Sequence, residues 1–166
     1  MRIDGYRFVH PTSRAVMRAW ARREPERDVP WAPLDKPRSE CRVALITSAG
    51  LAHVDDPPFD QEGERRNPWW GDPTHRVIQR GVQSEHIRVF HTHIDHRPAQ
   101  EDLDCLFPLR RLDELVDSGV VGDSAPNHYS IMGYLPKPDE MLATSVPAII
   151  QQLKAEQVDV LVLVPS

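Results

Sequence analysis

Cysteine is scarce in this chain, with two residues among 166, Cys41 and Cys105. They lie far apart in the sequence and neither belongs to a Cys-x-x-Cys pair, which argues against a disulfide scaffold. Free cysteine is among the most buried residue types, so we expect both to be small buried side chains.

Long hydrophobic runs are also absent. A bilayer-spanning helix needs about 18 apolar residues, whereas the longest apolar stretch, Val160 to Val164, has the length of a strand. Residues 1–6 lack the charged segment followed by an apolar one that marks a secretory signal. The formal charge of −5 gives no general electrostatic reason to bind nucleic acid. We therefore expect a cytoplasmic domain that binds neither membrane nor nucleic acid.

Proline, by contrast, is abundant, with 16 residues. Many fall within residues 1–40, where we expect a short helix over Ser13–Arg22 followed by an extended, proline-rich arm over Glu24–Glu40. Residues 41–166 carry the patterns of regular structure and form the second expected domain.

Hydrophobic patterning predicts the elements of this second domain. The expected strands are 42–48, 87–93, 129–135 and 158–164, the expected helices are 108–118 and one N-capped by Ser145, and 53–75 is a long loop. The first and last strands are continuous apolar runs, which fit strands covered on both faces of a parallel sheet. The prediction is an α/β fold with a mainly parallel, Rossmann-like sheet. Since no helix follows 158–164, we also expect the fold to be incomplete at the C-terminus.

The densest polar segment is His91-Thr92-His93-Ile94-Asp95-His96. Its spacing resembles the metal-binding signature of the metallo-β-lactamase fold, so one hypothesis is a metal-dependent hydrolase. That fold needs further metal ligands downstream, where His128 is the only histidine of this chain. Arg97-Pro98 also stands where that fold usually has a small, glycine-containing turn after the signature. We therefore expect no bound metal, and the remaining alternatives are substrate handling or a polar strand end without chemistry.

Five ordered motifs carry a more specific resemblance. They are residues 39–50 (SECRVALITSAG), 56–60 (DPPFD), 91–98 (HTHIDHRP), 101–108 (EDLDCLFP) and 128–134 (HYSIMGY). Together they resemble the selenoprotein B family of glycine, sarcosine, betaine and D-proline reductases. The resemblance covers roughly residues 30–166.

The resemblance implies component B of a selenol- or thiol-dependent reductase that cleaves the C–N bond of a small amine or amino acid. It further implies a companion subunit whose pyruvoyl group holds the substrate, a carrier of the selenoprotein A or thioredoxin type, and a dithiol as eventual electron donor. In that family a selenocysteine or cysteine follows the strand that resembles Val158–Val164. Cys41 and Cys105 lie elsewhere, so we expect no catalytic residue within this chain. The redox residue is expected immediately after Ser166, encoded by a UGA codon, and the chain alone is expected to be inactive.

Carried over by the same resemblance, the substrate-binding candidates are His91, His93, Asp95, His96, Arg97, His128 and Tyr129. Arg97 could pair a substrate carboxylate in bidentate fashion, or form a salt bridge to Glu101 or Asp102. His128 and Tyr129 could orient the substrate or form a buried structural pair. Asp60 and Asp72 are interpreted as turn and capping groups. Beside the reductase and the hydrolase, a non-catalytic partner subunit stays open as a third hypothesis.

Overall fold

The structure is a computed structural model that describes residues 10–23, 28, 30–67, 69–92 and 94–166. The chain divides into two compact units, Met1–Pro33 and Leu34–Ser166. In the first unit, helix α1 (Pro11–Ala21) confirms the expected helix. Residues 28 and 30–37 of the expected arm carry neither helix nor strand. The extended, proline-rich character of that arm stays a prediction.

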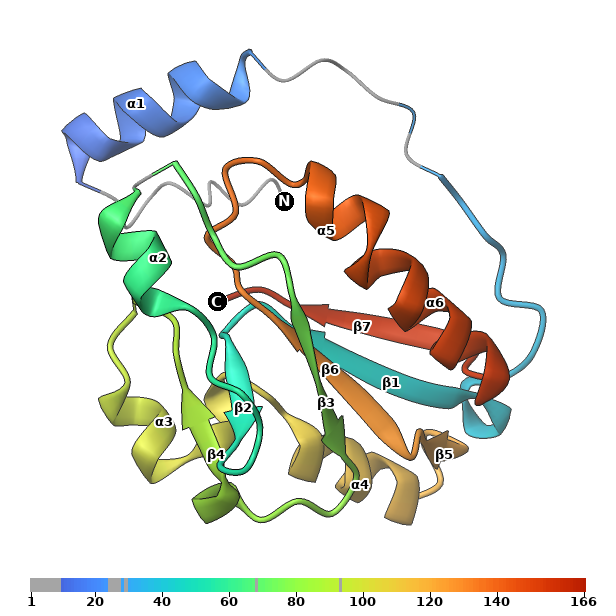
Figure 1. The fold of residues 1–166 in the computed structure, drawn as a ribbon. Coiled ribbons are helices and arrows are strands. Elements are labelled where there is room, and N and C mark those ends of the chain that lie inside the picture. Colours follow the sequence, from blue (N-terminus) through green and yellow to red (C-terminus); the bar gives the residue numbers. More distant parts are fainter. Residues whose placement is uncertain (1–9, 24–27, 29, 68, 93) are drawn as a thin grey trace. The chain divides into compact units, whose positions relative to one another are not determined.

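The second unit is built on a five-stranded sheet (Figure 1). Its strands are β1 (Arg42–Thr47), β3 (His75–Gln79), β5 (Asp123–Ser124), β6 (Asn127–Ile131) and β7 (Val160–Val164). β1 lies at the centre, with β6 and then β3 on one side and β7 on the other, while the short β5 pairs with the beginning of β1. The strands β5, β6 and β7 run parallel to β1, whereas β3 is antiparallel to β6. The fold is α/β as expected, and the sheet is mixed, with parallel pairings between β1 and β5, β6 and β7 and one antiparallel pairing between β3 and β6. Its Rossmann-like character stays a prediction.

A separate pair of antiparallel strands, β2 (Leu51–His53) and β4 (Ile87–Val89), stands apart from the main sheet. The strand expected over 87–93 therefore ends at Val89, and His91 and His96 lie in the segment between it and the helix that begins at Arg97. The expectation of an irregular loop over 53–75 is also wrong in part, because this segment contains helix α2 (Gln61–Arg66). Asp60 caps this helix by accepting from the Gly63 N–H, which confirms its interpretation as a capping group.

Helices cover both faces of the main sheet (Figure 1). They are α4 (Leu109–Asp117) and α6 (Ser145–Ala155), with shorter turns at η1 (Arg38–Glu40), η2 (Ser84–His86), α3 (Arg97–Glu101), η3 (Leu103–Cys105) and α5 (Asp139–Ala143). Leu109 and Leu112 of α4 pack against Val43 and Leu45 of β1 in the main core. Ser145 is the first residue of α6 rather than its N-cap, and its hydroxyl donates to the Pro73 carbonyl at 2.8 Å.

Two burial expectations prove wrong. β7 was expected to be covered on both faces, yet Leu163 is 71% exposed and Val162 41% exposed, and within the described residues β7 pairs with β1 alone. Cys41 is buried as expected, whereas Cys105 is exposed in η3. Among the helices of the described residues, none has the length and apolarity needed to cross a membrane.

Candidate functional site

Parallel strands bring their carboxyl ends to one edge of a sheet, where open α/β folds bind ligands. In this chain β6 and β7 lie on opposite sides of β1, and the residues that follow the three strands come together. The backbone N–H of Ser166 donates to the Ser48 hydroxyl at 2.9 Å. Gly133, which follows β6, lies against the Ser48 carbonyl so closely that a Cβ there would be 2.8 Å from it.

The loop after β4 places His91 at this edge. The Phe90 N–H donates to the Gly50 carbonyl at 2.9 Å, and the Gln61 side-chain amide donates to the Phe90 carbonyl at 2.6 Å. These bonds hold the loop between the end of β1 and helix α2. The His91 imidazole is 5% exposed, and a Cβ added to Gly133 would lie 3.1 Å from its Nε2. Glycine at position 133 therefore leaves the space that the His91 ring occupies.

His96 is joined to the same loop, because its Nε2–H donates to the His91 carbonyl at 2.6 Å. This bond requires a proton on Nε2 and so leaves the Nδ1 lone pair of neutral His96 as a proton acceptor. His93 lies outside the described residues. Within the part of the chain that is described, no group of three or more His, Cys, Asp or Glu side chains is placed to hold a metal ion.

Asp95 and Arg97 pair with each other at the surface. The Arg97 Nη2 lies 2.6 Å from Asp95 Oδ2, and its Nε lies 3.0 Å from both carboxylate oxygens. The hydrogen bonds from Arg97 lower the pKa of the Asp95 carboxyl below its ordinary value. Asp102, considered as a partner of Arg97 in the sequence, instead pairs with Arg110 at 2.8 Å. The Arg97 guanidinium is 84% exposed, so its donors are open to solutes.

Glu64 also belongs to this region, although the sequence did not indicate it. The run Glu64-Arg65-Arg66 is typical of the solvated face of a loop, so it predicts no buried role. Glu64 is buried on α2 and accepts a hydrogen bond from the Thr92 hydroxyl at 2.5 Å. The interaction ties the middle of the histidine loop to α2. No local sequence pattern signals it, because Glu64 and Thr92 lie far apart along the chain.

His128 and Tyr129 lie in the core rather than at this edge. Both are fully buried on β6. The Leu45 N–H donates to His128 Nδ1 at 3.0 Å, and Nε2 lies 3.3 Å from the Ser124 hydroxyl. Burial, with a smaller contribution from the charge of Arg80, lowers the pKa of His128 to about 4. Burial and then the charge of Glu156 raise the pKa of Tyr129 to about 12.

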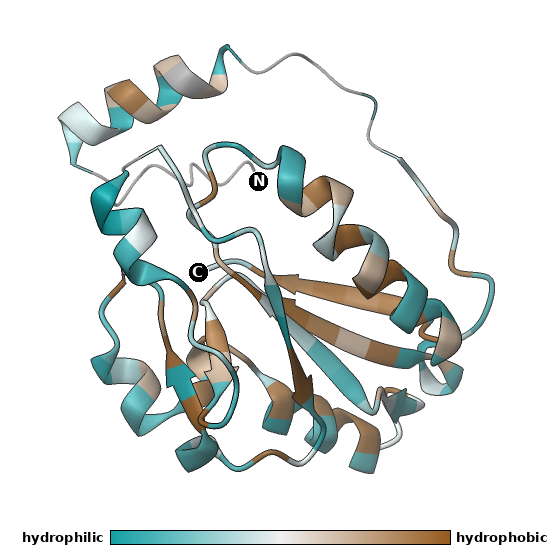
Figure 2. Cartoon of the chain, in the orientation of Figure 1, coloured by the Kyte–Doolittle hydropathy of each residue, from teal (hydrophilic) through white to brown (hydrophobic). Residues whose placement is uncertain are grey.

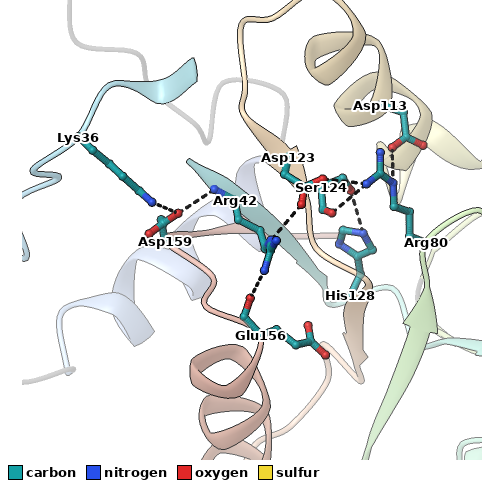
Figure 3. Close-up of polar contacts among 9 residues, drawn as sticks. All are labelled: Lys36, Arg42, Arg80, Asp113, Asp123, Ser124, His128, Glu156 and Asp159. Atoms are coloured by element: carbon teal, nitrogen blue, oxygen red, sulfur yellow. Dashed lines mark hydrogen bonds and ion pairs between the residues drawn. The ribbon is translucent and has the colours of Figure 1, made fainter. Parts of the chain in front are cut away.

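A network of charged groups surrounds the amino ends of the strands, close to His128 (Figure 3). Asp123 accepts from Arg42 at 3.0 Å and from Arg80 at 2.9 Å, and Lys36 lies 2.6 Å from Asp159. These side chains are each about a quarter to two fifths exposed, so water screens their charges and each pair contributes little stability. The network links the beginnings of β1, β5 and β7 and lies at the end of the sheet opposite to His91.

Comparison with known proteins connects the chain to an amino-acid reductase. Over 133 residues it is 29% identical to D-proline reductase subunit gamma of Acetoanaerobium sticklandii. The match covers 80% of this chain and 52% of the relative, so the chain spans about half the length of the curated relative that it matches. No protein-family model matches the chain. No solved structure matches it either.

The site at the carboxyl ends of β1, β6 and β7 thus combines one enclosed imidazole with exposed polar groups. His91 is shielded from solvent beside Gly133, while His96 lies further along the same loop and Arg97 begins α3. Such an arrangement can bind an anion through the guanidinium and can accept or donate a proton through an imidazole.

Proposed function

We propose that this chain is a component of a reductase complex that cleaves the C–N bond of a small amine or amino acid, with D-proline as the first substrate to test. The observation that carries the proposal is the identity of 29%, over 80% of this chain, with D-proline reductase subunit gamma. The ordered motifs that resemble the selenoprotein B family support the same chemistry, and three of them include site residues: Ser48, His91 and Gly133.

In the proposed reaction the Cα–N bond of D-proline breaks, and the carbon and the nitrogen each gain a hydrogen to give 5-aminovalerate. A dithiol supplies the two electrons and the two hydrogens and is oxidised to a disulfide. The resemblance assigns the attack on Cα to a selenolate or thiolate outside residues 1–166, and the holding of the substrate amine to a pyruvoyl group on a companion subunit. Cys41 is unsuited to the attack, because it is buried at the opposite end of β1 from the site.

The residues of this chain would bind and orient the substrate. In this proposal Arg97 exchanges its bidentate pairing with Asp95 for one with the substrate carboxylate, which has the same geometry. His91 and His96 form the wall of the binding site beside the carboxyl ends of the strands, as in the doubly wound, Rossmann-like folds that bind ligands at this edge. His93 belongs to the same proposed wall by its place in the motif.

The proposal is tested in the source organism by deleting the gene and measuring the formation of 5-aminovalerate from D-proline. We expect the deletion to abolish it, and re-expression of the gene with its downstream sequence to restore it. Arg97→Gln should reduce turnover at low D-proline concentration by about tenfold or more, because a lost charge-assisted bond costs about 1.5–3 kcal/mol. Arg66→Gln is the matched control, since Arg66 forms a similar exposed pair with Glu62 at 3.0 Å.

Two results would contradict the proposal. Undiminished D-proline reduction after deletion would show that the chain has no part in the reaction. Stoichiometric zinc or iron in the purified protein, lost in the His91→Ala variant, would favour the metal-dependent hydrolase instead.

Recovery of a pyruvoyl-containing subunit and of a thioredoxin-type carrier with the tagged protein would support the proposed partners. If the complex assembles but activity does not depend on His91 or Arg97, the chain is a non-catalytic partner subunit.

A further inference from the structure

One carboxylate of the short helix α2 is buried, although the helix as a whole is hydrophilic. Apart from Gly63, its residues are charged or carry a side-chain amide, and Figure 2 shows hydrophilic colour over most of the helix. Glu64 is nevertheless only 6% exposed, whereas the other charged residues of the helix are exposed. Charged side chains are rarely buried unless a partner compensates the loss of hydration. The burial of Glu64 therefore indicates a role inside the protein.

Glu64 and Gln61 contact the segment on either side of His91. Residues three apart are neighbours on one face of a helix, so Gln61 and Glu64 lie side by side on α2. The Gln61 side-chain amide donates to the Phe90 carbonyl at 2.6 Å, and Glu64 accepts from the Thr92 hydroxyl at 2.5 Å. The two bonds thus hold the residue before His91 and the residue after it.

The position of His96 depends on the same stretch of backbone. Its Nε2–H donates to the His91 carbonyl at 2.6 Å, so a displacement of the His91 backbone also displaces this contact. Thr92 is exposed, and packing therefore does little to fix it. Its hydrogen bond to the buried Glu64 restrains this part of the loop instead.

A helix can position a loop only if the helix is itself held in place, and the residues before α2 meet this requirement. Phe59 is 2% exposed, its ring centroid lies 6.2 Å from that of Phe90, and the Arg76 guanidinium lies 4.2 Å from the Phe59 centroid. The Asp60 N–H donates to the buried Asp72 carboxylate at 2.8 Å. Helix α2 therefore begins from an anchored segment.

We propose that Glu64 is a positioning residue of the site at the carboxyl ends of β1, β6 and β7. Through Thr92 it holds the loop that places His91 and His96 beside the strand ends. The consequence for catalysis rests on the proposed function, in which both histidines belong to the wall that binds the substrate. Loss of the bond should therefore raise the KM for D-proline and change kcat less, because such a wall binds the substrate before and during the reaction.

The first test is NMR spectroscopy of the full gene product with isotope-labelled histidine. Thr92→Val keeps the size of the side chain but cannot donate to Glu64, and the exposed position should tolerate it. We expect this variant to shift the ring signals of His91 and His96. Thr92→Ser keeps the hydroxyl and should leave them close to those of the parent.

Thr144→Val is the matched control for the NMR test. Thr144 is also exposed, and its hydroxyl donates to the Glu140 carbonyl at 2.8 Å at the end of α5. This variant loses a hydrogen bond of the same kind outside the site, so the signals of His91 and His96 should not change.

Kinetics of D-proline reduction in extracts of the source organism form the second test. Thr92→Val should raise the KM by about tenfold, the effect of losing one charge-assisted hydrogen bond. Thr92→Ser and Thr144→Val should keep the KM of the parent within about twofold. In a Glu64→Leu background, Thr92→Val should have no further effect, because the bond is already lost.

The two tests separate this inference from the proposed function. Unchanged signals of His91 and His96 in a folded Thr92→Val variant would overturn the positioning role, whatever the reaction is. Shifted signals with an unchanged KM would overturn the role in substrate binding. If the parent has no part in D-proline reduction, the proposed function fails, and the NMR comparison still decides whether Glu64 positions the loop.

Discussion

The burial of His128 makes the stability of this protein depend on pH in a predictable direction. Its Nδ1 accepts from the Leu45 N–H at 3.0 Å, so the proton of the neutral ring is on Nε2. Protonating Nδ1 would break this bond and place a charge inside the core. Burial first, and the charge of Arg80 second, lower the pKa of His128 from 6.5 to about 4.

The lowered pKa means that the unfolded chain binds the proton more tightly than the folded one. The contribution of His128 to stability is therefore complete above pH 6.5 and is lost as the pH falls toward 4. Each pKa unit corresponds to about 1.4 kcal/mol. We expect the free energy of unfolding to fall by about 2 kcal/mol between pH 7 and pH 5, and by about 3 kcal/mol in all once the pH is below 4.

Urea unfolding of the parent and of His128→Asn at pH 7 and pH 5 measures this effect. The Asn side-chain oxygen can still accept from the Leu45 N–H but does not titrate. The variant should lose about 1–3 kcal/mol at pH 7 through the smaller side chain, yet lose much less than the parent between the two pH values. His86→Gln serves as the control, since His86 is exposed. Equal pH dependence in the parent and in His128→Asn would refute the reasoning.

Two further substitutions test the candidate site. Gly133→Ala should lower the free energy of unfolding in urea by about 1–3 kcal/mol and should shift the NMR signals of the His91 ring. The reason is that the added Cβ would lie 2.8 Å from the Ser48 carbonyl and 3.1 Å from His91 Nε2. Unchanged stability and unchanged signals would contradict this packing. Arg97→Gln should raise the pKa of the Asp95 carboxyl, since hydrogen bonds from Arg97 are the main cause of its lowering, and an NMR titration that shows no rise would exclude that pairing in solution.

Among the candidate residues, the sequence could propose the loop from His91 to Arg97 as a polar centre, because its residue types are concentrated there. It could not show which of them are enclosed. His91 is buried where Gly133, from the end of a distant strand, lies beside its ring. The same holds for Glu64, whose position on α2 opposite Thr92 depends on contacts between segments 28 residues apart.

Local patterns predicted only some of the elements. The apolar run of β1 and the spaced leucines of α4 confirm the strand and the helix expected there, because hydrophobic periodicity reflects which face of an element is buried. The tertiary structure alone decided how the elements combine. His128 became a core residue because its ring meets the Leu45 backbone, 83 residues away. Within the described residues β7 pairs with β1 alone, although its composition is that of a central strand. Composition records how apolar a strand is, whereas its neighbours are chosen by contacts between distant segments, which no local pattern encodes.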